Sequence, residues 1–250
     1  MNRVLMLVTV TLLLAGCVTE VIGPQPNKPA SLEKQLQALV DLGIGYTRNG
    51  EYGRAKDNLN RALALDPESS KVHNAFGLVF QFEGETKLAD FHFSRAATDK
   101  SFTRAINNYG AFLYAQGRYQ EAIDQLKVAG EDQFYQNRPQ VYENLGVAYV
   151  QTGDANNAEA SFLRATQLNV SQGRALLELA DIRFKQKNHV EARDYYRRHI
   201  SASGQSSRSL GLCIQLARVF ANTNDEASCS LTLKNIFPAS EEAKLLEASS

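Results

Sequence analysis

The sequence predicts an all-α fold, a right-handed superhelical solenoid of about six helix pairs, and three observations support this prediction. A pattern of small and large apolar residues recurs along the chain at a nearly constant interval. Glycines fall where successive helices would end. The composition is rich in Ala, Leu, Asn and Gln and contains no Trp, which suits helices packed through medium-sized side chains. The central alanines of the pattern are spaced by 34, 33, 36 and 34 residues, at Ala55, Ala89, Ala122, Ala158 and Ala192.

The first sixteen residues have the pattern of a secretory signal peptide. Arg3 precedes an apolar run from Val4 to Leu14, and this run is shorter than the roughly 20 residues that a bilayer-spanning helix needs. Its end, Leu-Ala-Gly-Cys at residues 14–17, resembles a bacterial lipobox. We therefore expect residues 1–16 to be removed and Cys17 to be acylated. The alternative is an ordinary signal peptide with a Cys near the cleavage point.

A flexible tether is expected at residues 17–31, between the lipidated Cys17 and the folded domain. Residues 18–31 contain three Pro and one Gly, and they show no helix or strand periodicity. The solenoid should then occupy residues 32–240, followed by a C-terminal tail at 241–250 that is either a short polar helix or a frayed end. Six units are predicted at residues 36–69, 70–102, 103–138, 139–172, 173–206 and 210–240.

Each unit is expected to be two antiparallel helices that approach closely. A Gly in the first helix would let the second helix approach at its central Ala, so a larger side chain there should overpack the pair. Four units have this Gly, at Gly43, Gly77, Gly110 and Gly146. The period and the placement of small residues resemble those of the tetratricopeptide repeat family. The sixth unit is degenerate, with Cys229 in place of the central Ala, as terminal units of solenoids often are.

Two insertions lengthen the period. Residues 130–139 separate the third and fourth units and contain Phe134 and Tyr135, which would either pack back on the solenoid or meet a partner. Residues 201–207 are small and polar, and we expect a solvated loop there.

Cys213 and Cys229 lie sixteen residues apart in the last predicted unit. In an oxidising compartment they could form a disulfide between two antiparallel helices. The alternative is a pair of buried thiols that act as small apolar side chains.

The first helix of each pair should line the concave face of the solenoid. Helical spacing selects a mixed groove, with an aliphatic stripe across four units that suits a peptide or helix of a partner protein. The expected groove residues are Val40, Ile44, Thr47, Lys71, Asn74, Leu78, Gln81, Asn107, Ala111, Tyr114, Val147 and Val150.

The sequence gives no sign of catalytic, metal or nucleic-acid chemistry. Lys and Arg number 27 and Asp and Glu also number 27, so the basic excess of a nucleic-acid binder is missing. The four His have no metal-ligand spacing, and no phosphate loop or nucleophile elbow occurs. We expect a binding protein rather than an enzyme, with no cofactor and no metal.

Several strings go beyond the general repeat pattern. They include Asn-Asn-Tyr-Gly at 107–110, Glu-Asn-Leu-Gly at 143–146 and the paired Tyr195 and Tyr196. Together with the lipobox they resemble the type IV pilus biogenesis lipoproteins of the PilF/PilW family, the pilotins of the pilus secretin. The resemblance covers nearly the whole chain. It implies a lipid anchor on the periplasmic face of the outer membrane, and binding of secretin subunits that promotes their localisation and multimerisation. The alternative is a general periplasmic scaffold for outer-membrane protein assembly or for peptidoglycan enzymes.

Overall fold

A computed structural model describes residues 29–248, which form thirteen α-helices. The signal peptide, Cys17 and most of the expected tether lie outside the described residues. The helices are α1 (Pro29–Arg48), α2 (Tyr52–Leu65), α3 (Ser70–Glu83), α4 (Thr86–Ala96), α5 (Thr103–Ala115), α6 (Tyr119–Glu131), α7 (Arg138–Thr152), α8 (Ala155–Leu168), α9 (Gly173–Lys185), α10 (His189–Ser203), α11 (Ser207–Val219), α12 (Thr223–Ile236) and α13 (Glu241–Ala248).

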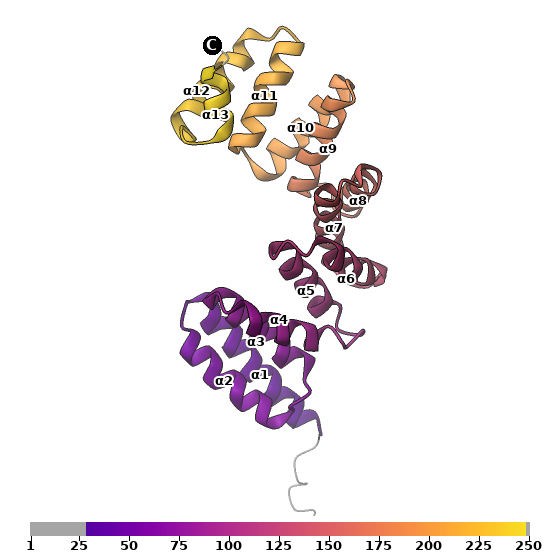
Figure 1. Cartoon of the computed structure of the whole chain (residues 1–250), viewed down its shortest axis with the longest axis vertical. Helices are drawn as coiled ribbons and strands as arrows, with labels where there is room; N and C mark the ends of the chain where they lie inside the picture. Colours follow the sequence, from indigo (N-terminus) through magenta and orange to yellow (C-terminus); the bar gives the residue numbers. More distant parts are fainter. Residues whose placement is uncertain (1–28, 249–250) are drawn as a thin grey trace, which may run out of the picture.

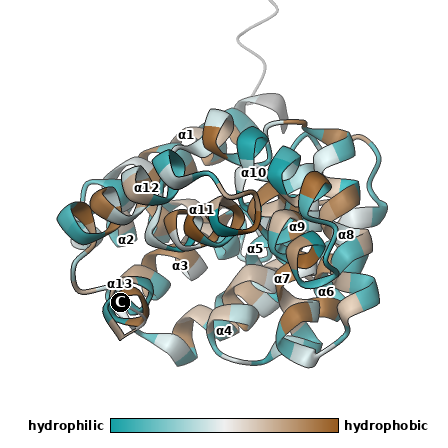
Figure 2. Cartoon of the chain, turned by 90° about the horizontal axis from the view of Figure 1, so that it is seen from above, coloured by the Kyte–Doolittle hydropathy of each residue, from teal (hydrophilic) through white to brown (hydrophobic). Residues whose placement is uncertain are grey.

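The helices form six consecutive antiparallel pairs, α1 with α2 through to α11 with α12, and α13 closes the C-terminal end. Figure 1 shows the pairs stacked along the long axis of the molecule, from α1 at the bottom to α13 at the top. Seen along that axis, successive pairs fan out in different directions, as in a superhelix (Figure 2). The all-α solenoid expected from the repeats is therefore confirmed.

Large side chains of the second helices fill the space between the partners of each pair. All five central alanines are buried. The glycines of the first helices, however, lie against the residue that follows the central Ala by one helical turn, and not against the Ala itself. A Cβ atom built on Gly146 would be 2.5 Å from the Phe162 ring, and one on Gly77 would be 2.6 Å from Phe93. The same holds for Gly43 against Leu59 and for Gly110 against Leu126.

The turns within the pairs contain a residue in the left-handed backbone conformation, with positive φ, as expected at Gly50, Gly117 and Gly153. The last two pairs place Lys187 and Ala221 in the same conformation, with φ of 62° and 52°.

The ends of several elements differ from the sequence-based expectation. Helix α1 begins at Pro29, inside the stretch 17–31 expected to be a tether, because Pro is well suited to the first position of a helix. The insertions at 130–139 and 201–207 are helical at both ends, so only residues 132–137 and 204–206 lie between helices. The tail forms α13, whose Ala243 and Leu246 are buried in a cluster with Leu210 and Ile214 of α11.

Candidate partner-binding groove

The first helices of the pairs, α1, α3, α5, α7, α9 and α11, lie side by side along the solenoid and form one of its faces. Seven of the twelve residues expected in the groove keep exposed or partly exposed side chains on these helices. They are Ile44, Lys71, Leu78, Gln81, Ala111, Tyr114 and Val150. The other five are buried between helices and are not available to a partner. They are Val40, Thr47, Asn74, Asn107 and Val147.

The buried five serve packing within the solenoid. Val40 belongs to the core of the first two units, and Val147 to the core between the fourth and fifth. The Thr47 hydroxyl donates to the carbonyl of Gly43 at 2.7 Å. On a helical wheel, the positions that face the groove lie beside the positions that pack against the first helix of the next unit. The spacing of residues alone therefore could not distinguish the two kinds of position.

Asparagine pairs connect neighbouring first helices across this face. The Asn108 amide donates to Oδ1 of Asn74 at 2.9 Å, and the Asn144 amide donates to Oδ1 of Asn107 at 3.4 Å. These bonds account for the two expected groove asparagines. The sequence analysis did not predict that Asn108 and Asn144 join neighbouring units. The separation of 34 residues between Asn74 and Asn108, which equals one repeat, is the signal that could have indicated it.

Charged side chains dominate the C-terminal half of the same face. Arg208 of α11 contacts both carboxylate oxygens of Glu178 on α9, at 2.5 and 2.8 Å, and reaches Asp181 at 3.4 Å. Lys185 also contacts Asp181, at 2.8 Å. The contacts of Arg208 join the fifth and sixth units, the pair of Lys185 with Asp181 lies within α9, and together they leave this half of the face polar.

The N-terminal half is different, because its partly exposed side chains are mainly apolar. Ile44, Leu78, Ala111 and Tyr114 come from the first three units. Leu78 and Tyr114 rest on the core of the second and third units, so they have firm support beneath them. Val150 extends this apolar character into the fourth unit. The face can therefore bind an apolar peptide or helix in its N-terminal half.

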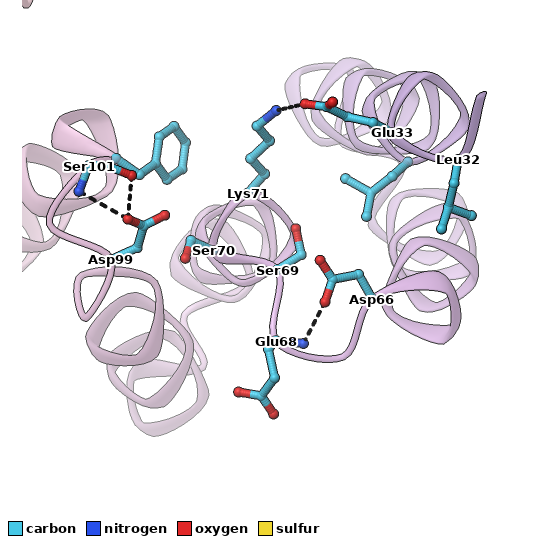
Figure 3. A pocket seen from close by; sticks show the side chains of 11 residues that line it. Leu32, Glu33, Asp66, Glu68, Ser69, Ser70, Lys71, Asp99 and Ser101 are labelled. Carbon is cyan, nitrogen blue, oxygen red and sulfur yellow. Dashed lines mark hydrogen bonds and ion pairs between the residues drawn. The ribbon is translucent and has the colours of Figure 1, made fainter. Parts of the chain in front are cut away.

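An open cleft of about 530 Å³ lies beside the groove, where α1, α3 and α5 begin. Figure 3 shows the contacts of most of its charged side chains, and Glu68, whose partner is not drawn there, pairs with Arg95. Lys71 lies 3.6 Å from Glu33, and Ser101 donates to Asp99 through both its amide and its hydroxyl. These bonds from Ser101 hold the pKa of Asp99 below its usual value. The cleft offers no unpaired charge that would select a ligand.

Two histidines are hydrogen-bonded to each other in the second unit. His73 Nε2 lies 3.1 Å from the carbonyl oxygen of Pro67, so it carries a proton and donates. Nδ1 of the neutral His73 ring must then accept from His92 Nδ1, 2.9 Å away. This network requires a neutral His73 ring and a proton on Nδ1 of His92.

The surroundings of the pair oppose its protonation. The His92 ring lies 4.9 Å from the Phe76 ring and 5.4 Å from the Phe80 ring, measured between centroids. Burial, with repulsion from His73 and Arg95, lowers the pKa of His92 to about 4. Burial also lowers the pKa of His73. The pair holds unit two together, and no functional role follows from it.

The two aromatic side chains of the loop at residues 132–137 lie in different environments. Tyr135 packs against the core of the second to fourth units. Phe134 is 96% exposed. The structure therefore assigns packing to Tyr135 and leaves only Phe134 free to meet a partner.

Cys213 and Cys229 are joined in a disulfide bond between α11 and α12. Both residues are buried in the C-terminal cluster. The bond fastens the two helices of the last pair.

Within residues 29–248, no three His, Cys, Asp or Glu side chains are grouped in a way that could hold a metal ion. None of the helices in this part of the chain has the length and apolar character needed to cross a bilayer.

Comparison with known proteins identifies close relatives. A model of tetratricopeptide repeats matches residues 143–207. The type IV pilus assembly protein PilF of Pseudomonas aeruginosa is 39% identical over 236 residues, which cover 94% of each chain. A solved structure of Pseudomonas aeruginosa PilF superposes with a TM-score of 0.84 and covers 88% of this chain and 100% of the other. PilW, a type IV pilus biogenesis factor, has the same fold, with a TM-score of 0.72 at 22% identity over 85% of this chain and 98% of its own.

Proposed function

The chain belongs to the family of the type IV pilus assembly protein PilF, and from this membership we propose that it is an outer-membrane lipoprotein that binds secretin subunits in type IV pilus biogenesis. Binding promotes the localisation of the subunits to the outer membrane and their assembly into multimers. The role is one of binding and does not involve catalysis.

The observation that best supports this proposal is the division of the face formed by the first helices. Its N-terminal half presents Ile44, Leu78, Ala111 and Tyr114, whereas its C-terminal half is occupied by ion pairs of Arg208 with Glu178 and Asp181. A secretin segment with an apolar face binds in the N-terminal half, where it covers these side chains. Each large apolar side chain covered in this way contributes about 1.5–3 kcal/mol at most.

The anchor and the groove have separate tasks in this proposal. Acyl chains on Cys17 hold the protein on the periplasmic face of the outer membrane, since two or more chains together bind firmly. The solenoid holds the subunit. Its capture near the membrane raises the local concentration of subunits, and this favours their assembly into a ring.

The groove is tested by substituting Leu78 and Val150 with Asp, one at a time. A buried carboxylate in the interface is costly, so each variant should capture purified secretin subunits at least about ten-fold more weakly, which corresponds to 1.4 kcal/mol. Leu88→Asp is the matched control, because Leu88 is an exposed leucine on the second helix of its pair. Circular dichroism checks that all three variants fold. Unchanged capture by the folded Leu78→Asp and Val150→Asp variants would exclude the groove.

The cellular role is tested by deleting the gene and examining secretin in membrane fractions. Detergent-resistant secretin multimers should disappear from the deletion strain and return with the wild-type gene. Normal multimers in the deletion strain, together with capture of other outer-membrane proteins, would favour the general scaffold instead.

A further inference from the structure

Every first helix begins at the same edge of the solenoid, because the two helices of each pair run in opposite directions. The chain enters its described part at this edge, where α1 begins at Pro29. Cys17 precedes Pro29 by only twelve residues. Twelve extended residues span at most about 40 Å, so a lipid on Cys17 keeps the start of α1 within this distance of the bilayer.

The loop between α6 and α7 lies at this edge and presents Phe134 in a fixed position. Asp132 accepts a hydrogen bond from the Thr103 hydroxyl at 2.5 Å and one from the Phe134 amide at 3.0 Å. Tyr135 is packed against the core on one side. Nevertheless the Phe134 side chain is 96% exposed. The bonds fix the loop backbone at Phe134, so only the side-chain torsions lose conformational freedom when the ring is buried by a partner.

The next connection along this edge, residues 169–172, also presents an exposed apolar side chain. Val170 is 68% exposed and lines an open cleft of about 350 Å³ together with Arg197 and Arg198 of α10. An exposed apolar side chain next to two arginines suits a surface whose apolar interior lies below anionic headgroups.

We propose that this edge of the solenoid rests on the lipid bilayer, with Phe134 and Val170 inserted at the level of the headgroups. The inference depends on the proposed acylation of Cys17. Two such side chains would bind a membrane weakly on their own, but the anchor makes the contact intramolecular and so raises its effective concentration. Aromatic side chains are favoured at the interface between headgroups and acyl chains. The contact fixes the orientation of the groove above the membrane.

The chain contains no Trp, so a single introduced Trp reports on its own position. The test compares Phe134→Trp with Phe82→Trp in the full acylated protein. Phe82 is a matched control, because it is a 61% exposed phenylalanine near the end of α3 and therefore at the opposite edge. Each variant is reconstituted on vesicles of phosphatidylethanolamine and phosphatidylglycerol that contain a doxyl-labelled lipid as quencher.

We expect the fluorescence of the Phe134→Trp variant to shift to shorter wavelength and to be quenched at least twofold more strongly than that of Phe82→Trp. Equal quenching of the two variants on vesicles to which the protein has bound would overturn the inference and leave the proposed function standing. Failure of the wild-type protein to float with vesicles would overturn both. A shift of the Phe134→Trp emission that occurs only after secretin subunits are added would assign Phe134 to the client protein and overturn the membrane contact.

Discussion

Single glycines set the distance between helices in this solenoid. Four first helices have no side chain where Leu59, Phe93, Leu126 or Phe162 of the second helix lies, and a Cβ atom at these points would be within 2.7 Å of the opposing side chain. Phe162 is fully buried, so its ring has little room to move away from Gly146. The close approach therefore depends on glycine itself and not merely on a small residue.

Gly146→Ala should lower the free energy of unfolding by about 1–3 kcal/mol, because it overpacks the pair α7 and α8. Urea unfolding followed by circular dichroism measures the change. Gly45→Ala is the control, since no atom lies within 4 Å of a Cβ atom at this position in the last turn of α1. Alanine there should raise stability by up to about 1 kcal/mol, from helix propensity. Equal effects of the two substitutions would refute the packing argument.

The His73–His92 pair predicts a dependence of stability on pH. The pKa of both rings is lower in the folded protein than in the unfolded chain, so the unfolded chain binds more protons at acidic pH. The stability from the neutral pair is fully present above about pH 6.5, and it is lost as the pH falls from there towards about 4, the pKa of His92.

Urea midpoints measured at pH 7.5 and pH 4.5 should show this loss. His92→Phe removes one of the two titrating groups and should reduce the difference between the two midpoints. Groups that face the pair, Arg95, Glu68 and Asp66, remain unchanged in this variant. A difference in midpoint as large as that of the wild type would show that other residues cause the dependence.

At the scale of elements, the last pair is held differently from the others. Its first helix is tied to α9 by Arg208 and to α12 by the disulfide between Cys213 and Cys229. Helix α13 covers part of α11 with Ala243 and Leu246. These devices replace the neighbouring unit that a terminal pair lacks.

Replacing both Cys213 and Cys229 with Ala should destabilise the last pair by about 2–4 kcal/mol, as expected for a bond that closes a loop of this length. The protein should then become susceptible to proteolysis between α11 and α13 at lower urea concentrations. A reducing agent should have the same effect on the wild type and none on the double variant. Equal resistance of both proteins under oxidising conditions would contradict the role of the bond.

Helix positions were largely predictable from the sequence, because the period of the alanines and the glycine turns directly reflect helix packing. The second to sixth units begin within a few residues of their expected positions. The places where helices extend beyond their expected ends have local causes. Pro29 begins a helix instead of extending a tether, and Gly130 remains inside α6, where the Tyr142 hydroxyl contacts its carbonyl. The groove was less predictable. Val40 and Val147 have the spacing of groove residues, yet contacts with neighbouring helices bury them, and these contacts depend on the superhelical twist.

At the scale of the whole molecule, folding and anchoring are expected to be independent. The core clusters of the described solenoid together reach all of its units, and the expected acylation site lies twelve residues before α1. Binding to a client and attachment to a membrane can then be changed separately.

Cys17→Ser should move the protein from the membrane fraction to the soluble periplasmic fraction without changing its thermal unfolding. Capture of secretin subunits in solution should also be unchanged, because the groove is intact. Thr19→Ala, two residues later, should remain with the membrane and serves as the control. A lower melting temperature of the Cys17→Ser variant would show that this residue belongs to the folded structure.

The linear order of contacts in the solenoid has a mechanical consequence. Each helix pair packs only against its immediate neighbours, so tension applied between α1 and α13 passes through every junction in series. A stack of this kind stretches by small rotations at each junction, as a spring does, before any single pair opens. The disulfide between Cys213 and Cys229 cross-links the two helices of the last pair. Pulling from both ends should therefore open the last pair fully only after this bond has been reduced.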